Sequence, residues 1–468
     1  MTTSIRSDDR ERIASFIRTT AEKSCDKKLT GIAIGVIVGG MEFSAVSGWA
    51  DLESKKPVSE STIFEIGSLT KLFTSLLLAV AVKRRDVSLD DPVQIALGEQ
   101  VTLPTDGRSQ ITWRSLANHR SSLPRLPDDL IKTADMENPY AHYDQEMFYA
   151  CLNRMESVKP IGSQAAYSNF GAGLLGHALG KLAGSDYRAA LKERVLTPLG
   201  MLNTSTESSD EQTTQLATAH KKKNKPAKHW DFTEVTVAAG GVRSSLSDMF
   251  KFLRANIDPT TSVLEDEIAM MREPSKLPHY ESNRANYIVR FLPILYVVAL
   301  AIFMTCMFGK QWITEIGRSG FLHFSIMLWP TLGAATRWGR IPGAVTLVLM
   351  TFLTWWLWGA AFAWFAELIW GAILVFLFSN WNPTKFVEQL RGEGRLAWQS
   401  WKFGSRSMLW HNGMVGGSAS YLGLVPEFEI GVVVLTNTAK SVDAIGDRIV
   451  SKLVKLKENE LRERNSDS

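Results

Sequence analysis

The sequence predicts a mixed α/β domain whose antiparallel sheet is built from both ends of the chain. Residues 31–50 (GIAIGVIVGGMEFSAVSGWA) give a clear hairpin signal, two strands around a Gly-Gly turn. Alternating strands return at residues 405–439, on the far side of a long insertion. We expect all these strands to join in one sheet, packed by a first helix near the N-terminus and a last helix from about Asp443.

Two insertions interrupt this sheet. Between Asp90 and about His229 the pattern is mostly helical, which predicts a helical subdomain. Residues 291–381 are overwhelmingly apolar, with a few charges grouped in short breaks, and this composition is typical of membrane-spanning helices. If the chain's ends pair in one sheet, the apolar block can enter at a surface loop without destroying the core.

The composition of the chain excludes several classes of function. The 468 residues are 45% hydrophobic and 21% charged, an ordinary globular balance with room for two or three domains. The net charge of +4 is small, and no basic helix interleaved with aromatics occurs, so we expect no nucleic-acid partner. Cys25, Cys151 and Cys306 are too few and too scattered for a disulfide framework or a zinc site, and no cluster implies a metal or an organic cofactor. The first 30 residues lack the apolar core of a signal peptide and look like an exposed amphipathic helix.

A serine and a lysine stand three residues apart at the start of an apolar helix. Residues 63–79 (IFEIGSLTKLFTSLLLA) read as an approach segment, a turn at Gly67 and a helix opened by Ser68. Residues three apart share a helix face, so the Lys71 amine can reach the Ser68 hydroxyl and take its proton if the pKa of the lysine is lowered. The backbone N–H of Ser68 would lie where negative charge is stabilised. The alternative is an ordinary N-cap serine with a surface lysine.

A second polar cluster stands before another helix. Residues 160–180 (PIGSQAAYSNFGAGLLGHALG) bring Tyr167 and Asn169 to a helix start. The phenol could act as a base beside a cation, and the amide could hold a substrate carbonyl or the lysine. The alternative is a turn with an Asn cap and a buried tyrosine. His119, at the end of an earlier helical segment, is interpreted as a cap or a packed side chain.

A third cluster lies on a predicted strand near the C-terminus. His411-Asn412-Gly413 precedes the glycine pair at 416–417. Glycine there lets a substrate backbone lie along the strand edge, and the N–H of Met414 could be a second oxyanion donor beside that of Ser68. The lysine-rich stretch 220–230 is interpreted as a solvated loop that would favour anionic substrates if it rims the site.

With the three clusters in hand, the sequence resembles a known family. FEIGSLTK, YSN and HNG, in this order, resemble the active-site motifs of the serine β-lactamase and penicillin-binding protein superfamily, specifically its class C and class-C-like esterase and D-amino-acid peptidase branch. The likeness covers roughly residues 10–270 and 395–455 and leaves out the apolar block. It implies a class C β-lactamase-like sheet flanked by helices, with a mostly helical subdomain.

The resemblance implies a role for each motif residue. Ser68 would be the acyl-accepting nucleophile and Lys71 its proton partner. Tyr167 would be the general base that later activates water, Asn169 a substrate-positioning amide and His411 an electrostatic group. The oxyanion hole and the substrate-binding edge would comprise the N–H groups of Ser68 and Met414 together with Asn412 and Gly413.

Two departures from the family pattern affect the expected substrate. His411 stands where class C β-lactamases carry lysine, so the site lacks a permanent positive charge for a β-lactam carboxylate. We therefore expect inefficient antibiotic hydrolysis. HRSSLP at 119–124 replaces the family's His-Thr-Ser-Gly-Leu-Pro, which removes a glycine from a loop near the site.

The apolar block constrains the topology. If residues 1–285 and 383–468 build one catalytic domain, they lie on the same face of the bilayer, so residues 286–382 must contain an even number of spans. Residues 291–308 fit one span and residues 341–378 fit two, because about 20 residues cross the hydrocarbon core. The shorter segment 321–335 is then needed as the remaining one of four.

Charge around the spans predicts an orientation in the lipid bilayer. Lys310 and Arg318 lie on one side, and a larger group lies on the catalytic side, namely Arg284, Arg290, Arg337, Arg340 and Lys385. The positive-inside tendency therefore favours a multi-pass membrane protein with its catalytic domain in the cytoplasm. Family members that process peptidoglycan act outside the cytoplasmic membrane, which favours the opposite side.

Three functions remain. The first is a membrane-anchored serine hydrolase that cleaves an ester or amide bond, including D-amino-acid peptides, in a small-molecule or peptide substrate through a Ser68 acyl-enzyme. The second is a penicillin-recognising sensor that acylates and turns over slowly or not at all. The third, weaker, is a transporter regulated by the hydrolase domain. Retention of Tyr167 and His411 favours turnover, since a sensor needs no deacylating water.

Overall fold

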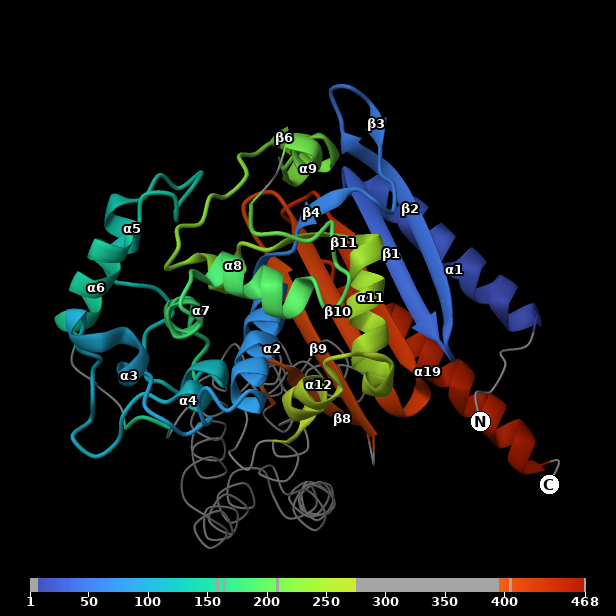
Figure 1. Cartoon of the computed structure of the whole chain (residues 1–468). Helices are drawn as coiled ribbons and strands as arrows, with labels where there is room; N and C mark the ends of the chain where they lie inside the picture. The colour runs from blue at the N-terminus through green and yellow to red at the C-terminus, as the bar shows by residue number, and fades with distance from the viewer. Residues whose placement is uncertain are drawn as a thin grey trace, which may run out of the picture. The chain divides into compact units, whose positions relative to one another are not determined.

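The computed structural model contains a central seven-stranded sheet in the order β3-β2-β1-β11-β10-β9-β8, with every pair antiparallel (Figure 1). It describes residues 7–155, 160–162, 165–207, 210–274, 395–403 and 406–466. The strands are β1 Gly31–Val38, β2 Met41–Asp51, β3 Lys56–Pro57, β8 Gln399–Phe403, β9 Arg406–Met414, β10 Ala419–Val425 and β11 Ile430–Thr436. Because β1 pairs with β11 along its length, the predicted union of the chain's two ends in one sheet is confirmed.

Two helices from opposite ends of the chain cover one face of the sheet. They are α1 (Ser7–Lys27) and α19 (Asp443–Ser466), blue and red in Figure 1. Ile32 and Ile34 of β1 point to this face and share a core with Ile17 of α1 and Ile449 of α19. The N-terminal helix is thus amphipathic as predicted, but its apolar side is buried rather than exposed.

The other face of the sheet carries the helices that position the site. These are α2 (Thr70–Lys83) and α11 (Leu246–Ile257), joined by the rings of Phe73 and Phe252 at 4.5 Å. A Cβ on Gly35 of β1 would lie 2.8 Å from Leu246, so glycine lets α11 pack close to the sheet. Residues 70–81 of α2 are all buried, which is why a lysine on this helix is removed from water.

Between Asp90 and His229 the regular elements of the described residues are mainly short helices separated by loops. These helices are α3 Gln94–Leu97, α4 Trp113–Ala117, α5 Leu130–Thr133, α6 Gln145–Asn153, α7 Asn169–Leu182, α8 Tyr187–Leu191 and α9 Asp210–Gln215. A short hairpin of β5 (His220–Lys221) and β6 (Lys225–Pro226) follows. The chain returns to the sheet through α10 Val237–Gly240, β7 Arg243–Ser245 and α12 Glu265–Arg272, and β7 pairs with β4 (Ile63–Glu65).

The apolar insertion is the block at residues 286–382 that was predicted to span a membrane. Residues 1–281 and 391–468 form one compact unit. Among the described residues, none of the helices has the length and apolar character needed to cross a bilayer. The spans predicted within 286–382, and the domain boundaries drawn beside them, lie outside the described residues.

Candidate active site

Ser68 lies in a tight turn between β4 and α2. The turn is the 3₁₀ segment Gly67–Leu69, and α2 begins at Thr70, so Ser68 precedes the α-helix rather than opening it. Gly67 has a φ of +52°, a left-handed conformation that favours glycine. The side chain at the N-cap of α2 makes no capping hydrogen bond, and the Ser68 hydroxyl instead faces two other side chains. The alternative of an N-cap serine is therefore wrong.

Lys71 is buried against that hydroxyl. Its amine nitrogen has three partners: Ser68 Oγ at 3.1 Å, Asn169 Oδ1 at 2.9 Å and the Ala239 carbonyl oxygen. Burial, and secondly the charge of Arg125, lower the pKa of Lys71 well below its usual range. A neutral amine has two N–H groups and one lone pair, and both carbonyl oxygens only accept. In the deprotonated form the two N–H groups stay with the carbonyl oxygens, and the lone pair is directed at Ser68 Oγ, to which the protonated amine donates.

Tyr167 approaches Ser68 from the helical subdomain. Its hydroxyl donates to Ser68 Oγ at 2.6 Å. The Lys71 nitrogen lies 4.8 Å, and the Arg125 guanidinium carbon 5.2 Å, from the centre of its ring. Positive neighbours of this kind stabilise the charge of a phenolate. The His119 ring packs on Tyr167 at 4.6 Å, so His119 is a packed side chain as interpreted, but one that touches the site.

Asn169 is the first residue of α7, and its side chain serves the site rather than the helix end. Ser168 caps α7 by accepting the N–H of Gly171, which leaves the Asn169 amide for other partners. Its oxygen accepts from Lys71 and its nitrogen donates to the Tyr140 hydroxyl at 3.2 Å. The alternative of an Asn cap is thus wrong, and the predicted contact with the lysine is present.

His411 lies on β9 and is 1% exposed. Its Nδ1 bonds the carbonyl oxygen of its own neighbour Asn412 at 2.7 Å. Burial, and secondly the charge of Lys71, lower the pKa of His411 to about 3. The imidazole is therefore neutral at pH 7, and the electrostatic role expected of it is reduced to that of an uncharged dipole.

The strand edge beyond His411 meets the nucleophile turn through its backbone. A Cβ on Gly413 would lie 2.0 Å from the Ile66 carbonyl oxygen and 2.9 Å from the Ser68 nitrogen. A Cβ on Gly67 would lie 2.6 Å from the Met414 nitrogen. The N–H groups of Ser68 and Met414 therefore belong to two segments in direct contact, while the Met414 side chain is 49% exposed.

The Asn412 side chain does not join the site. Its amide donates to Asp443 at the start of α19, at 2.9 Å. Successive strand residues point to opposite faces, so a strand that turns His411 toward Lys71 turns Asn412 toward α19. The prediction that Asn412 binds substrate is wrong for its side chain.

Comparison with known proteins identifies the family. A family model described as Beta-lactamase matches residues 13–288. The chain belongs to the β-lactamase family of serine hydrolases. This confirms the resemblance inferred from the sequence at the level of the family.

Individual relatives agree with this family. The β-lactamase of Escherichia coli K12 is 27% identical over 235 residues, which is 50% of this chain and 58% of that protein. The D-alanyl-D-alanine-carboxypeptidase/endopeptidase AmpH of the same strain is 30% identical over 226 residues, 48% of this chain and 57% of that protein. The chain thus spans somewhat more than half the length of these relatives.

Solved structures agree on the fold. The crystal structure of a class C β-lactamase from Rhodobacter sphaeroides superposes with a TM-score of 0.59 at 20% identity, covering 95% of this chain and 99% of that one. A second class C β-lactamase gives a TM-score of 0.61 at 16% identity, covering 95% and 98%. The class C β-lactamase-like fold predicted from the sequence is confirmed by this likeness, which at such identities concerns the fold alone.

Three residues around this β-lactamase-family site carried no assigned role in the sequence. Arg125 lies over Tyr167, and Tyr140 holds the Asn169 amide. Trp230 is the last residue of the lysine-rich stretch, and its indole lies against Gly416, where an added Cβ would come 2.4 Å from the indole nitrogen. The signal for Arg125 was its place directly after the HRSSLP segment that departs from the family pattern.

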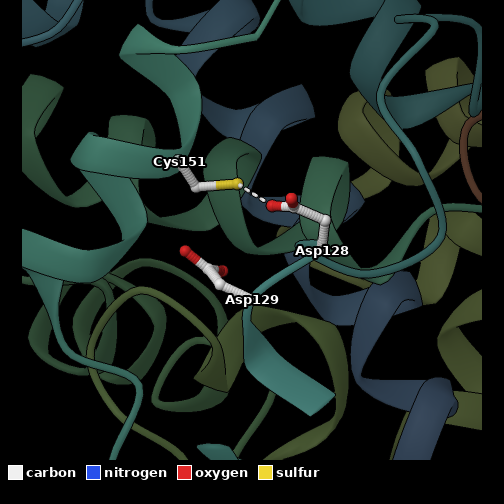
Figure 2. Close-up of side chains that lie close together, drawn as sticks. All are labelled: Asp128, Asp129 and Cys151. Atoms are coloured by element: carbon white, nitrogen blue, oxygen red, sulfur yellow. Dashed lines mark hydrogen bonds between the residues drawn. The ribbon is translucent and has the colours of Figure 1, made fainter. Parts of the chain in front are cut away.

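One cluster in the helical subdomain has the composition of a metal site. Figure 2 shows the Cys151 thiol directed at Asp128, with Asp129 beside them. Arg154 pairs with both carboxylates, and burial, before any other cause, raises the pKa of the Cys151 thiol. A guanidinium therefore already neutralises the acids, and the thiolate that a metal needs is disfavoured. We interpret the cluster as an ion-pair network.

Proposed function

We propose that this protein is a serine hydrolase that cleaves an ester or amide bond through an acyl-enzyme on Ser68. The observation that carries the proposal is the environment of Lys71. Its amine donates to two carbonyl oxygens and to Ser68 Oγ at 3.1 Å, so the loss of one proton leaves a lone pair directed at the serine. That arrangement is what a general base for a serine nucleophile requires.

Acylation follows from this geometry. Ser68 Oγ attacks the substrate carbonyl carbon and its proton passes to Lys71 Nζ. The N–H groups of Ser68 and Met414 then stabilise the oxyanion, a contribution that typically amounts to about 3 to 4 kcal/mol per donor. When the tetrahedral intermediate collapses, the bond to the leaving group breaks and the proton passes from Lys71 to the leaving oxygen or nitrogen.

Deacylation uses Tyr167 as the base. Its hydroxyl lies 2.6 Å from Ser68 Oγ, so a water attacking the acyl carbon can transfer its proton to this phenol oxygen when it is ionised. When the acyl bond breaks, Tyr167 passes this proton to the released Ser68 oxygen, and the product leaves as a free acid. The positive charge of Arg125 beside the ring supports this role.

The substrate class is proposed as small esters, amides or peptides, including bonds next to a D-amino acid. The D-alanyl-D-alanine carboxypeptidase/endopeptidase AmpH among the relatives supports a peptide substrate. Neutral His411 in place of a charged lysine argues for slow β-lactam hydrolysis.

We also propose that residues 286–382 anchor the enzyme in a membrane through four spans. The apolar composition of this block supports spans, and the pairing of β1 with β11 supports an even number, because both ends of the block then lie on one side. The basic residues on the catalytic side favour the cytoplasm. A test is Lys228→Cys in a variant without the native cysteines. Labelling of that exposed position from outside intact cells would overturn the cytoplasmic orientation.

The hydrolase proposal is tested by intact mass of detergent-purified protein during reaction with an activated ester, a penicillin and a fluorophosphonate. We expect an adduct on Ser68 that clears with the ester, and none in Ser68→Ala. A persistent adduct with every acylating compound would instead establish the sensor. No adduct in wild type would overturn both.

A further inference from the structure

The charges that shift the pKa values of Lys71, Tyr140 and His411 are positive. Arg125 is a cause of the lowered pKa of Lys71, after burial, and it opposes the rise that burial gives to the pKa of Tyr140. Lys71 in turn contributes to the lowered pKa of His411. Glu65, the carboxylate just before the nucleophile turn, is buried and already bonded by its own neighbours, with the main-chain N–H of Trp230 at 3.0 Å. A substrate therefore meets a positive potential beside Ser68.

Arg125 is the accessible source of that potential. Its side chain is exposed, and its guanidinium lies over the ring of Tyr167, whose hydroxyl touches Ser68. Its main-chain oxygen accepts the N–H of Asn169 at 2.9 Å, which fixes Arg125 beside the start of α7. Within the described part of the chain, Arg125 takes part in no ion pair.

The other basic groups near the site are less suited to bind an anion. Lys221 pairs with Glu137 at 3.1 Å and Lys228 pairs with Asp135 at 3.4 Å, so these two lysines of the predicted rim are compensated by acids. His411 is neutral at pH 7 because its pKa is lowered to about 3. Lys71 directs its N–H groups at Asn169 and at a main-chain carbonyl.

We infer that Arg125 binds a carboxylate of the substrate and sets a preference of this site for anionic esters or amides. The inference rests on the proposed hydrolase function and adds a specificity-determining residue to it. A guanidinium offers two parallel N–H donors to a carboxylate, and an exposed arginine without an acidic partner is ready to do so. The positive charge that the strand motif lacks is then supplied from the loop after HRSSLP.

The test compares two substrates that differ in one charge, 4-nitrophenyl hydrogen adipate and its methyl ester. The quantity measured is the ratio of their kcat/KM values, after subtraction of the spontaneous rate seen with Ser68→Ala. In Arg125→Gln we expect this ratio to fall about tenfold or more, the scale of one hydrogen bond to a charged group. Arg125→Lys should restore part of it. The matched control is Arg254→Gln, an exposed arginine of α11 that pairs with Glu42, and it should keep the wild-type ratio.

Salt provides an independent readout. In wild type the ratio should fall as NaCl rises from about 0.05 to about 0.5 M, because exposed charges are screened over that range, and in Arg125→Gln it should respond less. The effect should lie in KM for the anionic ester, which a loss of folding would not produce.

The outcomes separate the inference from the function on which it rests. If wild type cleaves both esters and Arg125→Gln keeps the same ratio, the Arg125 inference is wrong and the hydrolase stands. If wild type cleaves neither ester and the fluorophosphonate does not label Ser68, the hydrolase function is wrong and the inference falls with it.

Discussion

Lys71 on helix α2 and His411 on strand β9 are two buried nitrogen bases in one site, and their surroundings differ. Burial is the main cause of the lowered pKa of each. The Lys71 amine donates to two carbonyl oxygens and to the Ser68 hydroxyl oxygen, whereas the His411 Nδ1 is bonded to the next residue of its own strand. From this difference we infer that proton transfer is carried out by Lys71 on α2. The contribution of β9 is the position of its backbone beside the nucleophile turn.

The largest effect should follow removal of the Lys71 amine. Lys71→Met keeps the length and the burial of the side chain but leaves Ser68 without its base. We expect the rate of Ser68 labelling by a fluorophosphonate to fall about 10³-fold, within the range of general-base contributions. The control is Lys83→Met at the exposed end of the same helix, where the ammonium only pairs with Asp266. Equal rates of Ser68 labelling in wild type and Lys71→Met would contradict the assignment of proton transfer to Lys71.

The shape supplied by the strand can be broken at Gly413. Gly413→Ala puts a methyl group 2.0 Å from the Ile66 carbonyl oxygen, so β9 or the nucleophile turn must move. We expect a loss of about 1 to 3 kcal/mol in unfolding free energy and a fall of about 10²-fold in kcat/KM, since one oxyanion donor is displaced.

A matched control separates instability from misplacement. Gly107→Ala also strains a glycine, at a φ of +78°, but has open space around it and lies in the helical subdomain. It should cost about 1 kcal/mol of stability with activity retained. If both variants lose activity in proportion to stability, the strand edge has no special part in the chemistry.

Much of this arrangement could be predicted from the sequence because its signals are local. Strand alternation, the Gly-Gly turn and the spacing of Ser68 and Lys71 each involve neighbours in the chain. The start of α2 was misplaced by two residues, because a 3₁₀ turn and an α-helix share the same sequence signals.

What the sequence could not reveal depends on segments that are distant along the chain. Arg125 and Tyr140 gain their roles only because the helical subdomain folds back on α2. Arg125 was marked only by its place after HRSSLP, and no local pattern marks Tyr140. The neutrality of His411 likewise arises from burial in the assembled sheet. Asn412 is different, since strand alternation already placed it opposite His411, but the family motif outweighed that signal.

A smaller effect should follow replacement of His411. Because its pKa is lowered to about 3, His411 stays neutral through the usual assay range. His411→Gln should therefore reduce kcat/KM by less than about tenfold and leave the pH profile between about pH 5 and pH 8 unchanged in shape. In both proteins activity should rise with pH as Lys71 loses its proton. If one limb of the pH profile of kcat/KM disappears in His411→Gln, His411 titrates during catalysis.

The same group should leave a mark on stability. The folded-state pKa of His411 lies below its ordinary value of 6.5, so the unfolded chain binds the proton more readily. The contribution of neutral His411 to the free energy of unfolding is thus fully present above about pH 6.5, and it is lost as the pH falls toward about 3. Denaturant unfolding across this range should show a shallower acid decline in His411→Gln than in wild type.

The smallest effect on activity should come from Asn412, the strand residue that faces away from Ser68. Asn412→Ala removes the hydrogen bond to Asp443 at the start of α19, and we expect a loss of about 1 kcal/mol in unfolding free energy. Its kcat/KM should stay within about threefold of wild type, because the backbone of β9 keeps its register with β10. A large loss of activity at unchanged stability would mean that the side chain turns to the substrate, and the alternation that separates the two faces of β9 would then not decide which residues act.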